Sequence, residues 1–478
     1  MKEYFKKLAG DGFIYGLSGV ISRFISIFVI PIYTRYFPPE EFAIINLINV
    51  TFVAISIFVV LGLDNSAALW YWDKEATIER KKTFASWFWF LSFGALLIVV
   101  ITALGKEYIS QIILQDKLYG KLLLLAAGSF FFNVFSNVYT NWLKIQRKAL
   151  HTVAFTSITS LATIVLTIYI VVYEKMGIEG VFLAQLIASI ISFIYVIIAM
   201  QDWLHWRYFS FNRLKEMLHF SLPLIPALIC SWLLSSAGVF FIQYFQSKHE
   251  VGLYQIGNTI ATVMSLGTYA FINAWTPLAF SLQKKEDARD FYAGSFIVFV
   301  LYASMILVAL FLFIPEILYL FTSREYYGSA LVAGLIAINL LVASSIQILS
   351  IGSAIAKNNK SYSKAVIIGA IFTIVGYGLC VPLWGKTGCA IASIMSTLLT
   401  VVLVYYYSQK LYYIPYDIKK IVYIALICFS FCGAIFYFQS ESYGWLQVVV
   451  KSLLLLIYFS IVLSLFRKEL AFFFGAGK

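Results

Sequence analysis

The chain has 478 residues, of which 61% are hydrophobic and only 12% are charged, and its mean hydropathy is +0.87. This composition excludes a soluble globular protein and is typical of a polytopic membrane protein. The net charge of +12 does not indicate nucleic-acid binding, because the Lys and Arg residues gather in short tracts between apolar runs. The four His and five Cys residues show no metal-ligand spacing, so we expect no metal site and no cofactor.

Apolar runs of about 20 residues predict an all-α integral membrane protein with about fourteen transmembrane helices. Basic clusters occupy every second connection, which places both termini in the cytoplasm. The basic amino terminus leads into a run that is longer than the apolar core of a signal peptide, so we expect a retained first helix. The expected helices cover about residues 12–33, 42–63, 84–104, 121–142, 151–172, 177–200, 220–243, 251–279, 291–314, 328–356, 362–382, 387–408, 418–438 and 443–466.

Weak internal repetition suggests how these helices are grouped. Gly177-x-x-Gly180 opens the sixth expected helix and Gly385-x-x-Gly388 opens the twelfth, 208 residues later. The first six helices are therefore expected to recur as the next six, as two parallel repeats around a central cavity, which is a layout for alternating access. This predicts a six-helix bundle over 1–205, a second over 206–412, and two extra helices in 413–478.

Arg23 lies near the middle of the first apolar run, where a charge costs roughly 2.5 to 3.5 kcal/mol and marks a candidate functional site. No mid-membrane Asp or Glu stands out elsewhere in the chain, which favours an anionic substrate as its partner. The structural alternative is that Arg23 only snorkels or pairs with a carboxylate on another helix.

Amide side chains recur within several of the expected helices. Two interpretations remain open: these amides hydrogen-bond helices together, or they line a cavity and meet sugar hydroxyls. Dense Trp and Tyr residues at helix ends, Trp87 among them, are expected to form interface belts. The amide candidates are Asn133 and Asn137 at a four-residue step in 121–142, Asn46 and Asn49 in 42–63, and Gln255 and Asn258 in 251–279.

The motif Pro31-x-x-Thr34-Arg35-Tyr36-Phe37-Pro38-Pro39-Glu40-Glu41-Phe42, together with Leu61-Gly62-Leu63, the basic turn after 121–142 and the Gly-x-x-Gly at 177–180, resembles bacterial polysaccharide-biosynthesis flippases. These are O-antigen-type transporters of the multidrug/oligosaccharidyl-lipid/polysaccharide exporter superfamily. The resemblance implies a transporter, not an enzyme, that moves a polyprenyl-diphosphate-linked oligosaccharide to the outer leaflet of the bacterial inner membrane.

The resemblance also implies roles for individual residues. The transport arginine of the first helix corresponds to Arg23, whose planar guanidinium suits a diphosphate, and Arg35 is a further candidate substrate contact. A polysaccharide polymerase is a candidate partner. The rival functions are a cation-coupled multidrug exporter of the same superfamily, which would prefer buried carboxylates, and a membrane glycosyltransferase or polymerase, which would need a larger outer loop.

Overall fold

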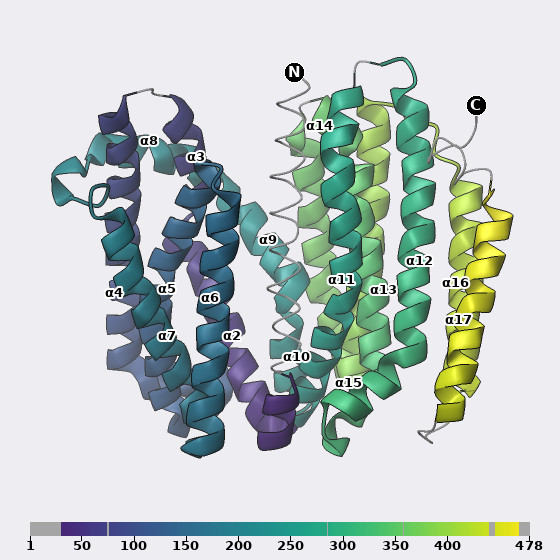
Figure 1. The fold of residues 1–478 in the computed structure, drawn as a ribbon, viewed down its shortest axis with the longest axis horizontal. Helices are drawn as coiled ribbons and strands as arrows, with labels where there is room; N and C mark the ends of the chain where they lie inside the picture. The colour runs from purple at the N-terminus through teal and green to yellow at the C-terminus, as the bar shows by residue number, and fades with distance from the viewer. Residues whose placement is uncertain (1–29, 74–75, 284, 357, 439–444, 468–478) are drawn as a thin grey trace. The chain divides into compact units, whose positions relative to one another are not determined.

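The computed structural model describes residues 30–73, 76–283, 285–356, 358–438 and 445–467, and the regular structure over these ranges is helical (Figure 1). Eleven of the described helices are long and apolar enough to cross a membrane. The described chain divides into two compact units, which we call the N-terminal unit (residues 30–236) and the C-terminal unit (residues 237–467). The expectation of an all-α membrane protein is confirmed.

The eleven helices follow from the expected fourteen by three differences. The first expected helix lies outside the described residues. The runs 362–382 and 387–408 form one kinked helix. Helix α11, which covers the run 251–279, is not among the eleven helices that are apolar enough to cross a membrane. The run 220–243 is divided among the end of α8, η4, α9 and α10, and the remaining runs each overlap one described helix or a few consecutive ones.

The N-terminal unit begins with helical residues 30–36. Its elements are α2 (Pro39–Val60), α3 (Leu63–Asp73), α4 (Thr77–Leu114), η1 (Lys117–Tyr119), α5 (Gly120–Ile145), α6 (Ala149–Ile168), η2 (Tyr169–Tyr173), α7 (Gly177–Met200), η3 (Trp206–Tyr208), α8 (Phe211–Ser221), η4 (Leu222–Leu224) and α9 (Ile225–Ser236). The break between α2 and α3 has a backbone cause, because Leu61 and Gly62 both adopt positive φ angles, of 51° and 68°.

The C-terminal unit consists of α10 (Gly238–Phe245), α11 (Lys248–Leu282), α12 (Ala288–Phe321), η5 (Arg324–Ser329), α13 (Ala330–Leu349), α14 (Ile351–Ile355), α15 (Asn359–Leu411), α16 (Ile418–Phe438) and α17 (Trp445–Leu465). Helix α15 contains one non-helical residue, Gly385, three residues after Pro382. The sequence therefore predicted the interruption between 382 and 387 correctly.

Aromatic side chains build much of the core of the N-terminal unit, where α5 packs against α4 and α7. Phe88 of α4 lies 4.8 Å from Phe135 of α5 between ring centroids. Trp87 is only 1% exposed. The interface-belt interpretation is thus wrong for Trp87, because it lies in a stretch of α4, Thr83 to Phe88, whose residues are all buried within the unit.

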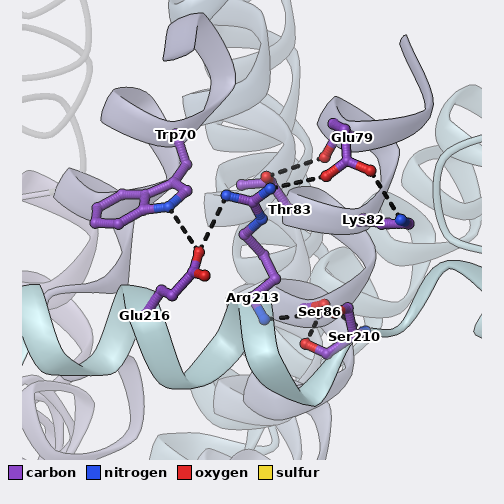
Figure 2. A network of polar contacts seen from close by, with 8 residues as sticks. All are labelled: Trp70, Glu79, Lys82, Thr83, Ser86, Ser210, Arg213 and Glu216. Carbon is purple, nitrogen blue, oxygen red and sulfur yellow. Dashed lines mark hydrogen bonds and ion pairs between the residues drawn. The ribbon is translucent and has the colours of Figure 1, made fainter. Parts of the chain in front are cut away.

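A polar network fastens α8 to α3 and α4 (Figure 2). Arg213 of α8 donates to Glu79 of α4 at 2.8 Å and to Glu216 at 3.2 Å, and Glu216 accepts from the indole of Trp70 on α3 at 3.2 Å. On the apolar face of this helix, Leu214 and Met217 are buried. These contacts, with those of α9 against α2, hold residues 211–236 in the compact N-terminal unit. The expected grouping into bundles over 1–205 and 206–412 stays a prediction.

Helices α16 and α17 both pack against α12 in the C-terminal unit. Lys451 of α17 forms an ion pair with Glu316 of α12 at 2.5 Å, and both side chains are about 85% buried. Glu316 lies five residues before the end of α12, so the expectation that no mid-membrane carboxylate stands out stays a prediction. The sequence ended this helix near residue 314, but α12 continues to Phe321 and carries Glu316 with it.

Candidate functional site

A pocket of about 390 Å³ opens within the N-terminal unit between α2, α5 and α7. Its volume falls in the range of small-molecule sites, about 300 to 1,000 Å³. The pocket is lined by Asn49, Phe52, Val53, Ser56 and Val60 of α2, by Ala126, Ser129, Phe130, Asn133, Val134 and Asn137 of α5, and by Gln185 of α7. Three membrane helices thus contribute polar groups to one site.

Helical periodicity explains why α5 presents its polar groups together. Ser129, Asn133 and Asn137 recur at four-residue steps, which places them one above the other on a single face. Both asparagine side chains are exposed, while Phe135 and Val138 are buried in the core. One face of α5 therefore packs the core and another lines the pocket.

The amides in the pocket do not join helices. Asn49, Asn133 and Gln185 make no side-chain hydrogen bond with any part of the chain that the structure describes. The oxygen of Asn137 accepts one long bond, at 3.5 Å, from Asn141 on its own helix. Of the two interpretations open from the sequence, the geometry of these pocket amides favours cavity lining, because an unpartnered amide in a pocket is available to a ligand.

The hydroxyl groups behave differently from the amides. Ser56 donates to the carbonyl of Val53 at 2.7 Å, and Ser129 donates to the carbonyl of Leu125 at 3.0 Å. These bonds occupy the hydroxyl protons within their own helices, so the serines offer the pocket only acceptor lone pairs. Donors for a ligand therefore come from the amides.

An aromatic pair forms the apolar part of the wall. The ring centroids of Phe52 on α2 and Phe130 on α5 lie 5.6 Å apart, with an interplanar angle of 39°. No Asp, Glu, Lys or Arg is among the described residues that line the pocket. The site therefore combines neutral donors and acceptors with aromatic carbon, and it provides no counter-ion for a charged ligand.

A family model described as "Polysaccharide biosynthesis protein" matches residues 32–289, which is more than half of the chain. The chain belongs to this family. The matched segment contains the whole α2–α5–α7 pocket. Among curated proteins, no sequence matches the chain at a significant level.

Solved transporter structures share the fold of this polysaccharide biosynthesis protein. The lipid II flippase MurJ, in an inward closed conformation, has a TM-score of 0.76 and 18% identity, covering 95% of this chain and 99% of its own. An inward-facing multidrug resistance MATE family transporter has a TM-score of 0.64 and 14% identity, covering 86% and 96%. A MOP superfamily transporter from Pyrococcus furiosus has a TM-score of 0.56 and 16% identity, covering 88% and 96%.

The structure brings together three of the residues that the sequence singled out, Asn49, Asn133 and Asn137. Asn46 is not among the residues that line the pocket, and its side chain donates to the carbonyl of Phe42 on its own helix at 2.9 Å.

The remaining candidates of this polysaccharide biosynthesis protein lie elsewhere. Gln255 is buried and Asn258 half-buried on α11 of the C-terminal unit. Arg35 is exposed, in the helical residues before α2, and Arg23 lies outside the described residues.

The lining also includes functional candidates that sequence reasoning missed. Gln185 is the only amide in the apolar run 177–200, and this isolation was a usable signal. Phe52 and Phe130 gave no signal, because phenylalanine is common throughout the apolar runs. The described residues contain no group of three or more His, Cys, Asp or Glu side chains that could hold a metal ion.

Proposed function

We propose that this protein is a flippase that moves a polyprenyl-diphosphate-linked oligosaccharide from the cytoplasmic to the outer leaflet of the bacterial inner membrane by alternating access. The cargo would serve the assembly of an O-antigen or capsule type of surface polysaccharide. The single observation that carries the proposal is a pocket of unpartnered amides, built on membrane helices, in a member of a polysaccharide biosynthesis family.

The chemistry of the pocket supports a glycan cargo. Sugar hydroxyls both donate and accept hydrogen bonds, and an amide side chain supplies two donors and two acceptor lone pairs. Asn49 and Asn133 are exposed in the pocket and make no hydrogen bond with the described chain, so their donors and acceptors are available to a polar ligand. The fold shared with a lipid II flippase is consistent with this cargo.

The diphosphate needs a different binding group from the sugars. In this proposal Arg23 binds it, since a guanidinium offers parallel donors to phosphate oxygens and a mid-membrane arginine requires an anionic partner. Both termini would lie in the cytoplasm. Once in the outer leaflet, the cargo would become the substrate of a polysaccharide polymerase. The protein would thus transport its substrate without chemical change.

Export of organic cations is the main rival, because multidrug MATE transporters share this fold. A cation site within a membrane requires carboxylates to stabilise the bound charge. The α2–α5–α7 pocket presents none among its described lining residues. The buried Glu316 is already paired with Lys451, so its negative charge is neutralised and does not provide a site for a cation.

The test is the leaflet distribution of polyprenyl-diphosphate-linked glycan in cells whose own copy is replaced by an Asn133→Leu, Asn137→Leu double variant at matched membrane level. We expect the glycan to accumulate on the cytoplasmic side, as it also should when the whole protein is depleted. The control is Asn339→Leu on α13, which removes a partly buried amide outside the pocket. Normal outward transfer after complete depletion would refute the flippase function.

A further inference from the structure

The residues that line the α2–α5–α7 pocket determine whether it prefers charged or neutral ligands. Its polar lining consists of amides and hydroxyls, and the described lining residues carry no net charge. A carboxylate or ammonium group that left water for this pocket would lose its hydration without gaining a counter-ion, which is strongly unfavourable. An uncharged polar group would exchange its water hydrogen bonds for amide hydrogen bonds at little cost. The pocket therefore favours neutral ligands over charged ones.

The amides converge from three helices. Asn49 comes from α2, Asn133 and Asn137 from α5, and Gln185 from α7. A ligand between them must offer hydrogen-bonding groups in several directions around its edge. A pyranose ring does so, because its hydroxyl or acetamido groups radiate from the rim.

The aromatic pair suits the other surface of such a ring. Phe52 and Phe130 present adjacent phenyl rings, 5.6 Å apart between centroids, beside the amides. The faces of a pyranose carry C–H groups, which pack favourably on aromatic carbon while the rim stays hydrogen-bonded. A lipid tail would satisfy the phenyl rings but would leave the amides unpaired, so it fits the pocket less well.

We propose that this pocket is a subsite for one uncharged sugar unit, a hexose or N-acetylhexosamine, of the lipid-linked substrate. The proposal rests on the proposed flippase function, since it identifies which part of that cargo the pocket binds. It also implies that the sugar and the diphosphate bind at different sites, because the diphosphate must be bound outside this neutral pocket. Asn133 and its neighbours then determine which sugar is accepted and do not anchor the lipid.

The experiment measures binding of three defined lipids to the purified full-length protein in nanodiscs. The probes are undecaprenyl diphosphate bearing N-acetylglucosamine, the same lipid bearing glucuronic acid, and undecaprenyl diphosphate without a sugar. For the wild type we expect the neutral sugar to strengthen binding over the bare lipid and the glucuronate to give no such gain. In Asn133→Leu we expect about a fivefold loss for the neutral-sugar probe, the value of one hydrogen bond, with bare-lipid affinity unchanged.

A second variant, which should gain affinity for one probe, distinguishes a specific effect on the pocket from a general folding defect. Asn133→Lys places a cation in the pocket, so we expect the glucuronate probe to bind more tightly than in the wild type and the neutral probe more weakly. Asn339→Leu on α13 should leave all three affinities unchanged. A wild type that binds sugar-bearing and bare lipids equally, or prefers glucuronate, overturns the sugar subsite alone. Failure of the wild type to bind any diphosphate lipid overturns the flippase function itself.

Discussion

Arg213 and Glu79 form an ion pair at 2.8 Å although 134 residues separate them, and this pair joins α8 to the beginning of α4. The Arg213 side chain is only 10% exposed, so the pair is well shielded from water on its cationic side. Through this contact the segment that leads out of the N-terminal unit is held by the same helix that forms part of its core (Figure 2).

We expect Arg213→Met to lower the free energy of unfolding by about 1 to 2 kcal/mol, since it removes a charge-assisted hydrogen bond to a partly exposed carboxylate. The loss stays moderate because Glu79 keeps Lys82 as a partner at 2.8 Å. Thermal unfolding of the detergent-solubilised protein measures the effect. Glu216→Gln is the control and should change stability less, because the Glu216 side chain is 56% exposed. Equal effects of both variants would contradict the importance of the Arg213–Glu79 pair.

The buried pair of Glu316 and Lys451 gives a second prediction. We expect Lys451→Met to destabilise the protein by about 3 to 5 kcal/mol, because it leaves a buried carboxylate without its counter-ion. Combining it with Glu316→Gln should recover much of that loss, since no uncompensated charge then remains. A double-mutant cycle on thermal stability in detergent checks this. If the two single effects simply add in the double variant, the two side chains do not form a functional ion pair.

Gly385 gives a third prediction, based on backbone strain. Its φ of 55° and ψ of −135° lie in a region that other residues rarely adopt. We expect Gly385→Ala to cost about 1 to 3 kcal/mol. The nearest atom to an added Cβ is in Gln246 at 3.5 Å, an ordinary contact, so the cost arises from the backbone and not from crowding.

The matched control for this effect is Gly378→Ala in the same helix. An added Cβ at Gly378 meets no described atom within 4 Å, and alanine has the higher helix propensity. This substitution should therefore be neutral or stabilising in the same thermal unfolding assay. A Gly385 variant as stable as the Gly378 variant would show that the kink tolerates ordinary residues.

Sequence periodicity was sufficient to predict features that depend on a single helix. The four-residue step of Asn133 and Asn137 predicted a shared face, and hydropathy located the helices, because both depend only on local geometry. Asn46 shows the limit of this reasoning. It lies three residues before Asn49, yet its amide is used by a carbonyl of its own helix, which spacing alone cannot reveal.

Tertiary packing determined the rest. Hydropathy cannot tell which unit a helix joins, and the attachment of α8 depends on Arg213 meeting Glu79 far away in the sequence. Glu316 was overlooked because the apolar run appeared to end before it, while packing extends α12 beyond that point. Phe52 and Phe130 acquire a role only because α2 and α5 meet beside the amides.

The fourth prediction concerns the driving force of the proposed transport. A diphosphate carries about two negative charges, and moving them outward across an inside-negative membrane releases roughly 4 to 5 kcal/mol per 100 mV. If Arg23 binds the diphosphate, its positive charge returns inward in the same field once the cargo is released, so the potential favours both halves of the cycle. In proteoliposomes, collapse of the potential with valinomycin and symmetrical potassium should slow flipping of the lipid-linked glycan. Nigericin, which dissipates the pH gradient and leaves the potential, should have little effect; the opposite pattern would indicate that proton exchange drives transport.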